Sequence, residues 1–133
     1  MSMSLAQELN TVTLFERLGG SAGVRRIVDG AIAAHMCNPA IRERFVPYED
    51  RPEYVEEVKT HTCDFFAAGS GGPDNYRGRS MTEAHSGMNI NAAEYQAASD
   101  DILNTLRALK YDKTTRSMVH DIIRSLESDI LHK

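Results

Sequence analysis

Apolar residues along the chain recur at intervals of three and four, which is the period of an amphipathic helix. Within "SAGVRRIVDGAIAAHMCNP" the apolar positions form one stripe from Val24 to Met36. The predicted helix begins near Ser21 and ends before Pro39, because proline cannot continue a helix. Comparable stripes predict three more long helices, over residues 52–69, 91–109 and 114–131. The sequence has no strand-like alternation, so we expect an all-α fold.

Helix starts are marked by a capping residue that is followed three positions later by a glutamate. The pairs are Thr13/Glu16, Asp50/Glu53, Ser80/Glu83 and Asn91/Glu94. In such a capping box both side chains bond to backbone amides that the first turn leaves unpaired. Gly19 and Gly20 end a very short first helix, and Gly87 ends a one-turn helix that holds His85. The chain therefore predicts four main helices and two short ones, with a glycine-rich loop at residues 69–78.

Composition narrows the class of protein. The chain has 133 residues, of which 41% are hydrophobic and 26% are charged, and this composition predicts a single globular domain. We expect the domain to comprise residues 13–133, after a leader at residues 1–12. The net charge of −4 argues against nucleic-acid binding, which requires a basic surface. No apolar run is long enough to span a bilayer. With two cysteines and no secretion signal, we expect a cytoplasmic location.

Two of the five histidines have surroundings that indicate chemistry. His61 lies about 60° around the helical wheel from Val58 and so borders the apolar face of its helix. His85 follows the glycine-rich loop on a short capped helix. A histidine facing an apolar helix that carries a second histidine suits an iron held by a flat organic ring. His35, on an apolar stripe, is interpreted as a core or pocket-edge histidine with a bonded ring nitrogen.

Four stretches resemble the truncated, or two-over-two, haemoglobins of group I. They are "LFERLGG" (14–20), "NPAIRERF" (38–45), "FFAAGSGGPDNYRGRSMTEAH" (65–85) and "GMNI" (87–90). The similarity covers residues 14–131, nearly the whole chain. The resemblance implies a two-over-two helical sandwich that encloses haem b, iron protoporphyrin IX.

The resemblance also implies a role for each matching position. His85 matches the proximal histidine that binds the iron, Phe45 the phenylalanine that packs on the porphyrin, and Phe66 the aromatic residue that gates an apolar tunnel. Phe65 lines the pocket beside Phe66. Tyr76, Arg79 and Met81 match the loop that wraps the proximal edge of the haem. The alternative is that these three residues only hold the loop in place. Arg79 is expected to bond to a haem propionate. The remaining expected wall residues are Ile32, Val58, Thr62, Met88, Ile90, Tyr95, Ala98 and Ile102.

The distal side departs from the family. Ile32 replaces a tyrosine of the second helix, and Thr62 replaces a glutamine of the distal helix. Extra residues between Phe45 and that helix displace its start. His61 matches the position at which some cyanobacterial members place a histidine that coordinates the iron as a sixth ligand. The alternative for His61 is a solvent-edge histidine that bonds to a propionate.

Two functional interpretations remain open. The first is a haem-binding globin that reversibly binds oxygen, nitric oxide or carbon monoxide, with bis-histidyl iron where His61 coordinates. The second is a haem-free helical scaffold or sensor domain that binds a partner protein. Losing a distal donor costs about 1–2 kcal/mol of ligand stabilisation, and the Thr62 hydroxyl can bond to its own helix instead. Nitric oxide dioxygenation is therefore less favoured than in the relatives, and weak peroxidase activity is the other enzymatic option. Expected partners are the gas ligands and a reductase, with the chain a monomer or weak homodimer.

Overall fold

The computed structural model describes residues 12–133, so the predicted leader lies outside the described part except for its last residue. The four long helices are α3 (Gly20–Cys37), α4 (Pro52–Gly69), α6 (Ala92–Ala108) and α7 (Lys113–Ile130). The two short α-helices are α2 (Leu14–Arg17) and α5 (Met81–His85). These elements confirm the predicted helices. Two 3-10 turns that the sequence did not predict, η1 (Arg42–Arg44) and η2 (Val46–Tyr48), form the corner before α4.

Capping side chains fix most of the helix starts. The Thr13 hydroxyl accepts a hydrogen bond from the backbone N–H of Glu16 at 3.1 Å, and the capping boxes at the starts of α5 and α6 are complete. The prediction that Asp50 caps α4 is wrong. That helix begins at Pro52, which has no N–H to satisfy at the first helical position. At α7 the cap is Asp112, which accepts from the N–H of Thr115 at 2.8 Å and has no glutamate partner to mark it in the sequence.

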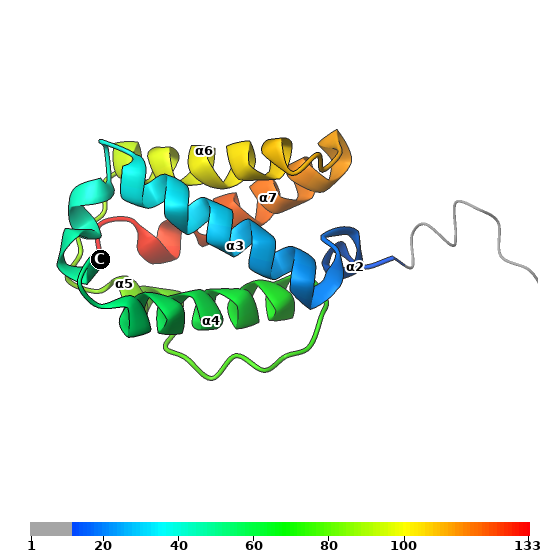
Figure 1. The fold of residues 1–133 in the computed structure, drawn as a ribbon, viewed down its shortest axis with the longest axis horizontal. Coiled ribbons are helices and arrows are strands. Elements are labelled where there is room, and N and C mark those ends of the chain that lie inside the picture. The colour runs from blue at the N-terminus through cyan, green and yellow to red at the C-terminus, as the bar shows by residue number, and fades with distance from the viewer. Residues whose placement is uncertain (1–11) are drawn as a thin grey trace, which may run out of the picture.

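The long helices form two packed pairs, and this arrangement is the predicted two-over-two sandwich. Helix α3 packs against both α4 and α6, and α6 packs against α7 (Figure 1). The tightly packed core begins at the end of the molecule near α2, and its buried members are Leu14, Leu18, Val24, Ile27, Val28, Ile32, Leu106, Val119 and Ile123. Leu14 and Leu18 come from α2 and its end, and the other core residues come from α3, α6 and α7. Farther from α2, the C-terminal parts of α3 and α7 and the N-terminal part of α6 surround a cavity.

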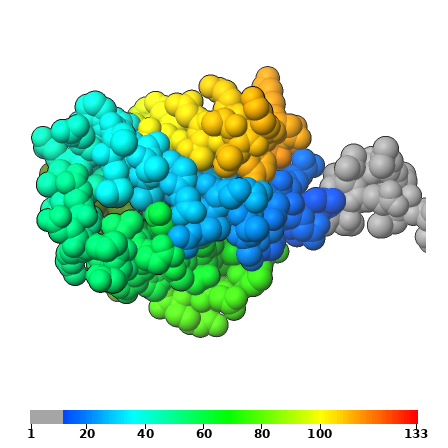
Figure 2. Space-filling view, viewed as in Figure 1, coloured from blue at the N-terminus to red at the C-terminus, as the bar shows by residue number. Residues whose placement is uncertain are grey.

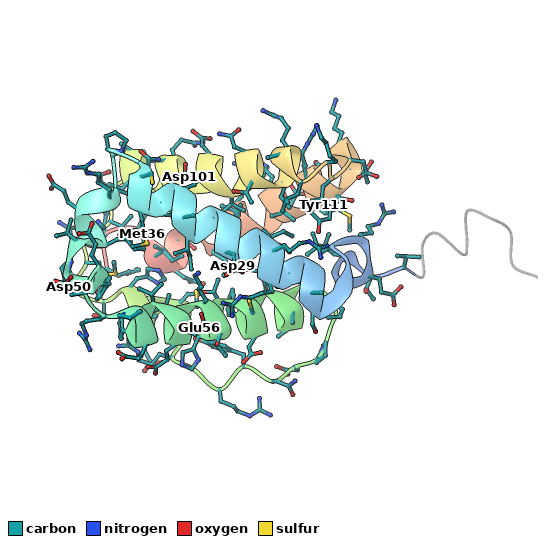
Figure 3. All side chains as sticks on the ribbon, in the orientation of Figure 1. Asp29, Met36, Asp50, Glu56, Asp101 and Tyr111 are labelled. Carbon is teal, nitrogen blue, oxygen red and sulfur yellow. The ribbon has the colours of Figure 1, made fainter. Side chains whose placement is uncertain are left out.

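Helices α3 and α6 approach closely where they cross. A Cβ atom at Gly30 would lie 2.6 Å from Cγ2 of Thr105, so a larger residue would separate the two helices. This approach brings the C-terminal end of α3 beside Asp101 of α6, which is labelled in Figure 3. Among residues 12–133, no helix combines the length and apolar character needed to cross a membrane.

Candidate functional site

A cavity of about 330 Å³ lies between the helices. Its size falls within the range of roughly 300–1,000 Å³ that is typical of small-molecule sites. In the space-filling view the surface is hollowed between the cyan segment of α3 and the green segment of α4 (Figure 2). The apolar side chains of the wall include Ile32, Phe45, Val58, Phe66, Ile90, Ala98, Ile102, Ile123 and Ile130. The sequence leaves this end of the sandwich hollow and apolar.

His85 lines the cavity from the last residue of α5. Its Nδ1 lies 2.8 Å from the backbone oxygen of Met81. A carbonyl oxygen can only accept a hydrogen bond, so Nδ1 carries the proton and donates. The other ring nitrogen, Nε2, therefore keeps its lone pair, and a neutral imidazole in this state is the form that ligates a metal.

The segment that follows α5 is anchored by the last residues of the chain. The backbone N–H of Gly87 donates to the oxygen of Lys133 at 3.0 Å, and the N–H of His132 donates to the oxygen of Ile90 at 2.9 Å. Helix α5 also packs against α7. Although α5 has only five residues, these contacts hold its orientation and with it the direction of the His85 ring.

The part of the wall that comes from α4 is formed by Val58, Thr62 and Phe66, which are spaced one turn apart. The Thr62 hydroxyl donates to the backbone oxygen of Val58 at 2.7 Å, as the sequence predicted for a threonine within a helix. Ile32 from α3 is 7% exposed and completes this side. These side chains present carbon atoms and a hydroxyl that is already bonded.

Most of the site residues predicted from the sequence are brought together around this cavity. They are Ile32, Phe45, Val58, Thr62, Phe66, His85, Met88, Ile90, Tyr95, Ala98 and Ile102. Five others are placed outside its wall: His61, Phe65, Tyr76, Arg79 and Met81. The assignment of these residues to haem contact stays a prediction.

Three of these residues, His61, Phe65 and Tyr76, form a group of rings that joins α4 to the glycine-rich loop. The rings of Phe65 and Tyr76 meet edge to face with centroids 5.4 Å apart, and the ring of His61 lies 6.4 Å from that of Tyr76. The His61 side chain is 51% exposed, and its Nε2 is 3.7 Å from a carboxylate oxygen of Glu57. The Tyr76 hydroxyl donates to the backbone oxygen of Arg79, whose side chain is exposed. The Tyr76 hydroxyl thus bonds within the loop, and the haem contacts expected for Tyr76 and Arg79 stay predictions.

The rotation of α4 explains why His61 lies outside. The sequence placed His61 at the border of the apolar face, about 60° around the helix from Val58. In the structure the face toward the cavity is centred on Thr62, so His61 lies about 100° from its centre. Cys63, the next residue along α4, packs against the core. Burial accordingly raises the pKa of its thiol.

Ion pairs between α3 and α4 accompany this rotation. Arg25 donates to Glu56 at 2.8 Å and to Asp29 at 2.9 Å, and the Lys59 ammonium lies 3.2 Å from Asp29. Figure 3 labels Asp29 at α3 and Glu56 at α4, the two helices that these contacts join. The hydrogen bond from Arg25 lowers the pKa of the Glu56 carboxyl. Since Glu56 and Lys59 face α3, His61 is turned toward solvent.

Several polar residues of the wall were not among the predicted site residues: His35, Arg44, Tyr48, Glu94 and Ser99. Arg44 donates to Glu94 through two N–H groups, one of them at 2.9 Å, and this contact lowers the pKa of Glu94. His35 lies 2.8 Å from Asp101, which confirms that it is a pocket-edge histidine with a bonded ring nitrogen. The contacts of Arg44 with Glu94 and of His35 with Asp101 join residues that are 50 and 66 positions apart in the sequence, so no local pattern marks them.

Comparison with known proteins gives consistent matches. The bacterial-like globin family model matches residues 13–132. A group 1 truncated hemoglobin of Tetrahymena pyriformis is 27% identical over 91% of this chain and 96% of its own. Its crystal structure in the Fe(III) form superimposes with a TM-score of 0.84 at 24% identity, over 92% of this chain and all of the other. A 2/2 hemoglobin from a Synechococcus species, in the cyanomet state with covalently attached heme, gives a TM-score of 0.80 at 25% identity, over 90% and 98% of the two chains.

The helical sandwich, its apolar cavity and the histidine on α5 define a globin. The chain belongs to the bacterial-like globin family, as a truncated haemoglobin of group 1. Haem is therefore its cofactor, and the cavity fits a flat apolar ring: its wall is mostly carbon, and Nε2 of His85 is free to hold the iron. This membership supports the first of the two functional interpretations.

Proposed function

We propose that this protein reversibly binds small diatomic molecules, namely oxygen, nitric oxide or carbon monoxide, at its haem iron. One observation carries the proposal: His85 offers a free ring nitrogen to the cavity, while the wall formed by Ile32, Val58 and Thr62 offers no group that ligates iron. Bound haem supplies an iron with one coordination position for His85 and one for a diatomic molecule. The cavity residues hold the ring, exclude water and leave that second position accessible.

For His61 we propose the rim position rather than iron ligation at rest. Its side chain is half exposed beside Glu57, and it points about 100° around α4 from Thr62, at the centre of the cavity face. Bringing it to the iron would require α4 to rotate. The ion pairs that join Arg25 to Glu56 and Lys59 to Asp29 oppose this rotation.

The structures of relatives support ligand binding in this fold. The Synechococcus hemoglobin was crystallised in a cyanomet state, which places an added ligand on that protein's iron. For the present chain we propose an electron-donating partner such as a reductase, because oxidised iron must be reduced before it binds oxygen again. A monomer or weak homodimer is the assembly that we propose for this activity.

The experiment is a ligand titration of the reconstituted protein. Ferrous protein under argon is expected to show a five-coordinate, high-spin spectrum that converts fully on addition of carbon monoxide and recovers when the gas is removed. His61→Leu is expected to give the same resting spectrum. Absence of a carbon monoxide complex would contradict the proposed function. A low-spin resting spectrum that disappears in His61→Leu would instead show that His61 is an iron ligand.

A further inference from the structure

Most polar side chains of the cavity wall are already bonded to other protein groups. The Thr62 hydroxyl donates to the oxygen of Val58, and the Ser99 hydroxyl donates to the oxygen of Tyr95 at 2.8 Å. The Tyr95 hydroxyl donates to the oxygen of Ile123. These hydroxyl protons are therefore committed to the backbone, and a ligand inside the cavity must find its polar contact elsewhere.

His35 is different, because only one of its ring nitrogens is bonded. Nδ1 lies 2.8 Å from Oδ2 of Asp101, and the two side chains are 13% and 14% exposed. Asn38 holds the same carboxylate by donating to both of its oxygens, at 3.2 Å and 3.1 Å. The His35 ring also stacks against Phe45, with centroids 5.8 Å apart. Contacts from α6, from the turn after α3 and from the corner before α4 thus fix this ring.

The hydrogen-bond partner of Nδ1 determines which nitrogen of the His35 ring carries the proton. A carboxylate accepts hydrogen bonds and cannot donate one, so Nδ1 carries a proton in both the neutral and the charged form of His35. Nε2 of the neutral ring is then an acceptor with a free lone pair. Among the described residues, no buried side-chain nitrogen or oxygen lacks a hydrogen-bond partner. Nε2 has no protein partner, so it keeps accessible surface, and His35 lines the cavity.

We propose that His35, oriented by Asp101, is the proton acceptor of the haem cavity and favours ligands that arrive as protonated weak acids. The chemical class is HX, of which hydrogen cyanide, hydrogen sulfide and hydrogen peroxide are members. The inference rests on the proposed function, because it requires that the iron accept an added ligand. It extends that function from neutral diatomic gases to acids that must lose a proton as they bind.

The proton transfer balances without any other reactant. As hydrogen cyanide binds to ferric iron, its H–C bond breaks and the electron pair stays on the carbon that joins the iron. The proton passes to Nε2 of His35, directly or through a water in the cavity. Asp101 stabilises the positive charge that the ring gains, as the carboxylate does in a serine–histidine–aspartate triad. No electron is transferred in this step.

The surroundings of His35 are compatible with this role. Arg44 and Glu94, two wall residues of opposite charge, are bonded to each other and so compensate one another. Tyr48 also lines the cavity, and its ring stacks on Tyr54 with centroids 4.7 Å apart. His120 of α7 supplies a matched control: it lies outside the cavity wall, and its Nδ1 is 3.8 Å from a carboxylate oxygen of Asp121.

The test compares a ligand that carries a proton with one that does not. In His35→Leu the rate of cyanide association to the ferric protein at neutral pH should fall by about 100-fold, the lower end of the usual contribution of general acid–base catalysis. Carbon monoxide association to the ferrous protein should be unchanged. The same change at a histidine outside the cavity, His120→Leu, should leave both rates unchanged. Equal slowing of both ligands, or no slowing of cyanide, would overturn the proposal.

Asp101→Asn is the second variant, because it keeps the shape of the side chain and does not remove the histidine. An amide no longer forces the proton onto Nδ1, so cyanide association should slow while carbon monoxide association does not. Nitrogen-15 spectra of the carbon monoxide complex give an independent readout: Nδ1 of His35 should be protonated and Nε2 bare. The reverse assignment would overturn the proposal. Failure of the wild type to bind carbon monoxide would contradict the proposed function itself.

Discussion

Replacing Thr62 by valine removes the hydroxyl nearest to the centre of the α4 wall with little change of shape. In the structure this hydroxyl donates to the backbone oxygen of Val58 at 2.7 Å, so it is not available to a ligand. The rate of oxygen dissociation in Thr62→Val is therefore expected to equal that of the wild type. If the hydroxyl donated to oxygen, its loss would remove about 0.5–1.5 kcal/mol, which corresponds to roughly two- to twelve-fold faster escape.

The assay is stopped-flow displacement of oxygen by carbon monoxide in the two proteins. Ile32→Tyr is the complementary variant, because Ile32 lines the same cavity and is 7% exposed. A tyrosine there adds a donor, so oxygen escape should slow by up to about tenfold. Faster escape from Thr62→Val by several-fold would refute the assignment of its hydroxyl to the helix.

Three further predictions concern other parts of the site. Burial raises the pKa of Tyr95 to about 12 from the usual value near 10. The contribution of this shift to stability is therefore complete below about pH 10 and is lost as pH rises toward 12. In an alkaline titration followed by circular dichroism, Tyr95→Phe should lose less helical signal than the wild type. Ser80→Ala removes the cap of α5 and should cost about 1 kcal/mol, which is expected to speed haem loss to apomyoglobin, and an unchanged rate would show that the cap does not position His85. Phe66 lines both the cavity and a small void beside Leu18, so Phe66→Ala should alter carbon monoxide rebinding after flash photolysis while the equilibrium spectrum stays the same.

The helices could be predicted from the sequence because each one is determined locally. The three-and-four spacing of apolar residues predicted α4 at its observed bounds, Pro52–Gly69, and the capping boxes at Ser80 and Asn91 mark real starts. The position of His85 at the end of a short capped helix could be predicted because its loop, cap and glycine are all local features. The capping pattern gave a wrong prediction at Asp50. There α4 begins at Pro52, which has no backbone N–H to satisfy and so needs no side-chain cap at that position.

The rotation of α4 could not be predicted from the sequence. The apolar stripe permits a range of angles, and the angle found is accompanied by contacts from Glu56 and Lys59 to residues of α3. These pairs are 31 and 30 positions apart in the sequence, and charged residues are common enough that neither pair stands out. For the same reason the contact of His35 with Asp101, between α3 and α6, appears only in the folded chain. The sequence accordingly placed His61 nearer to the cavity than the structure does, and it predicted about half of the residues that line the wall.

The central claim is that His85 holds the haem iron through Nε2. Resonance Raman spectroscopy of the ferrous, ligand-free protein measures the stretching vibration of the bond between iron and the proximal imidazole. The band should be present in the wild type, absent in His85→Gly, and restored when free imidazole fills the space that the side chain has left. A His85→Gly protein that retains haem and shows the wild-type band without added imidazole would contradict the claim.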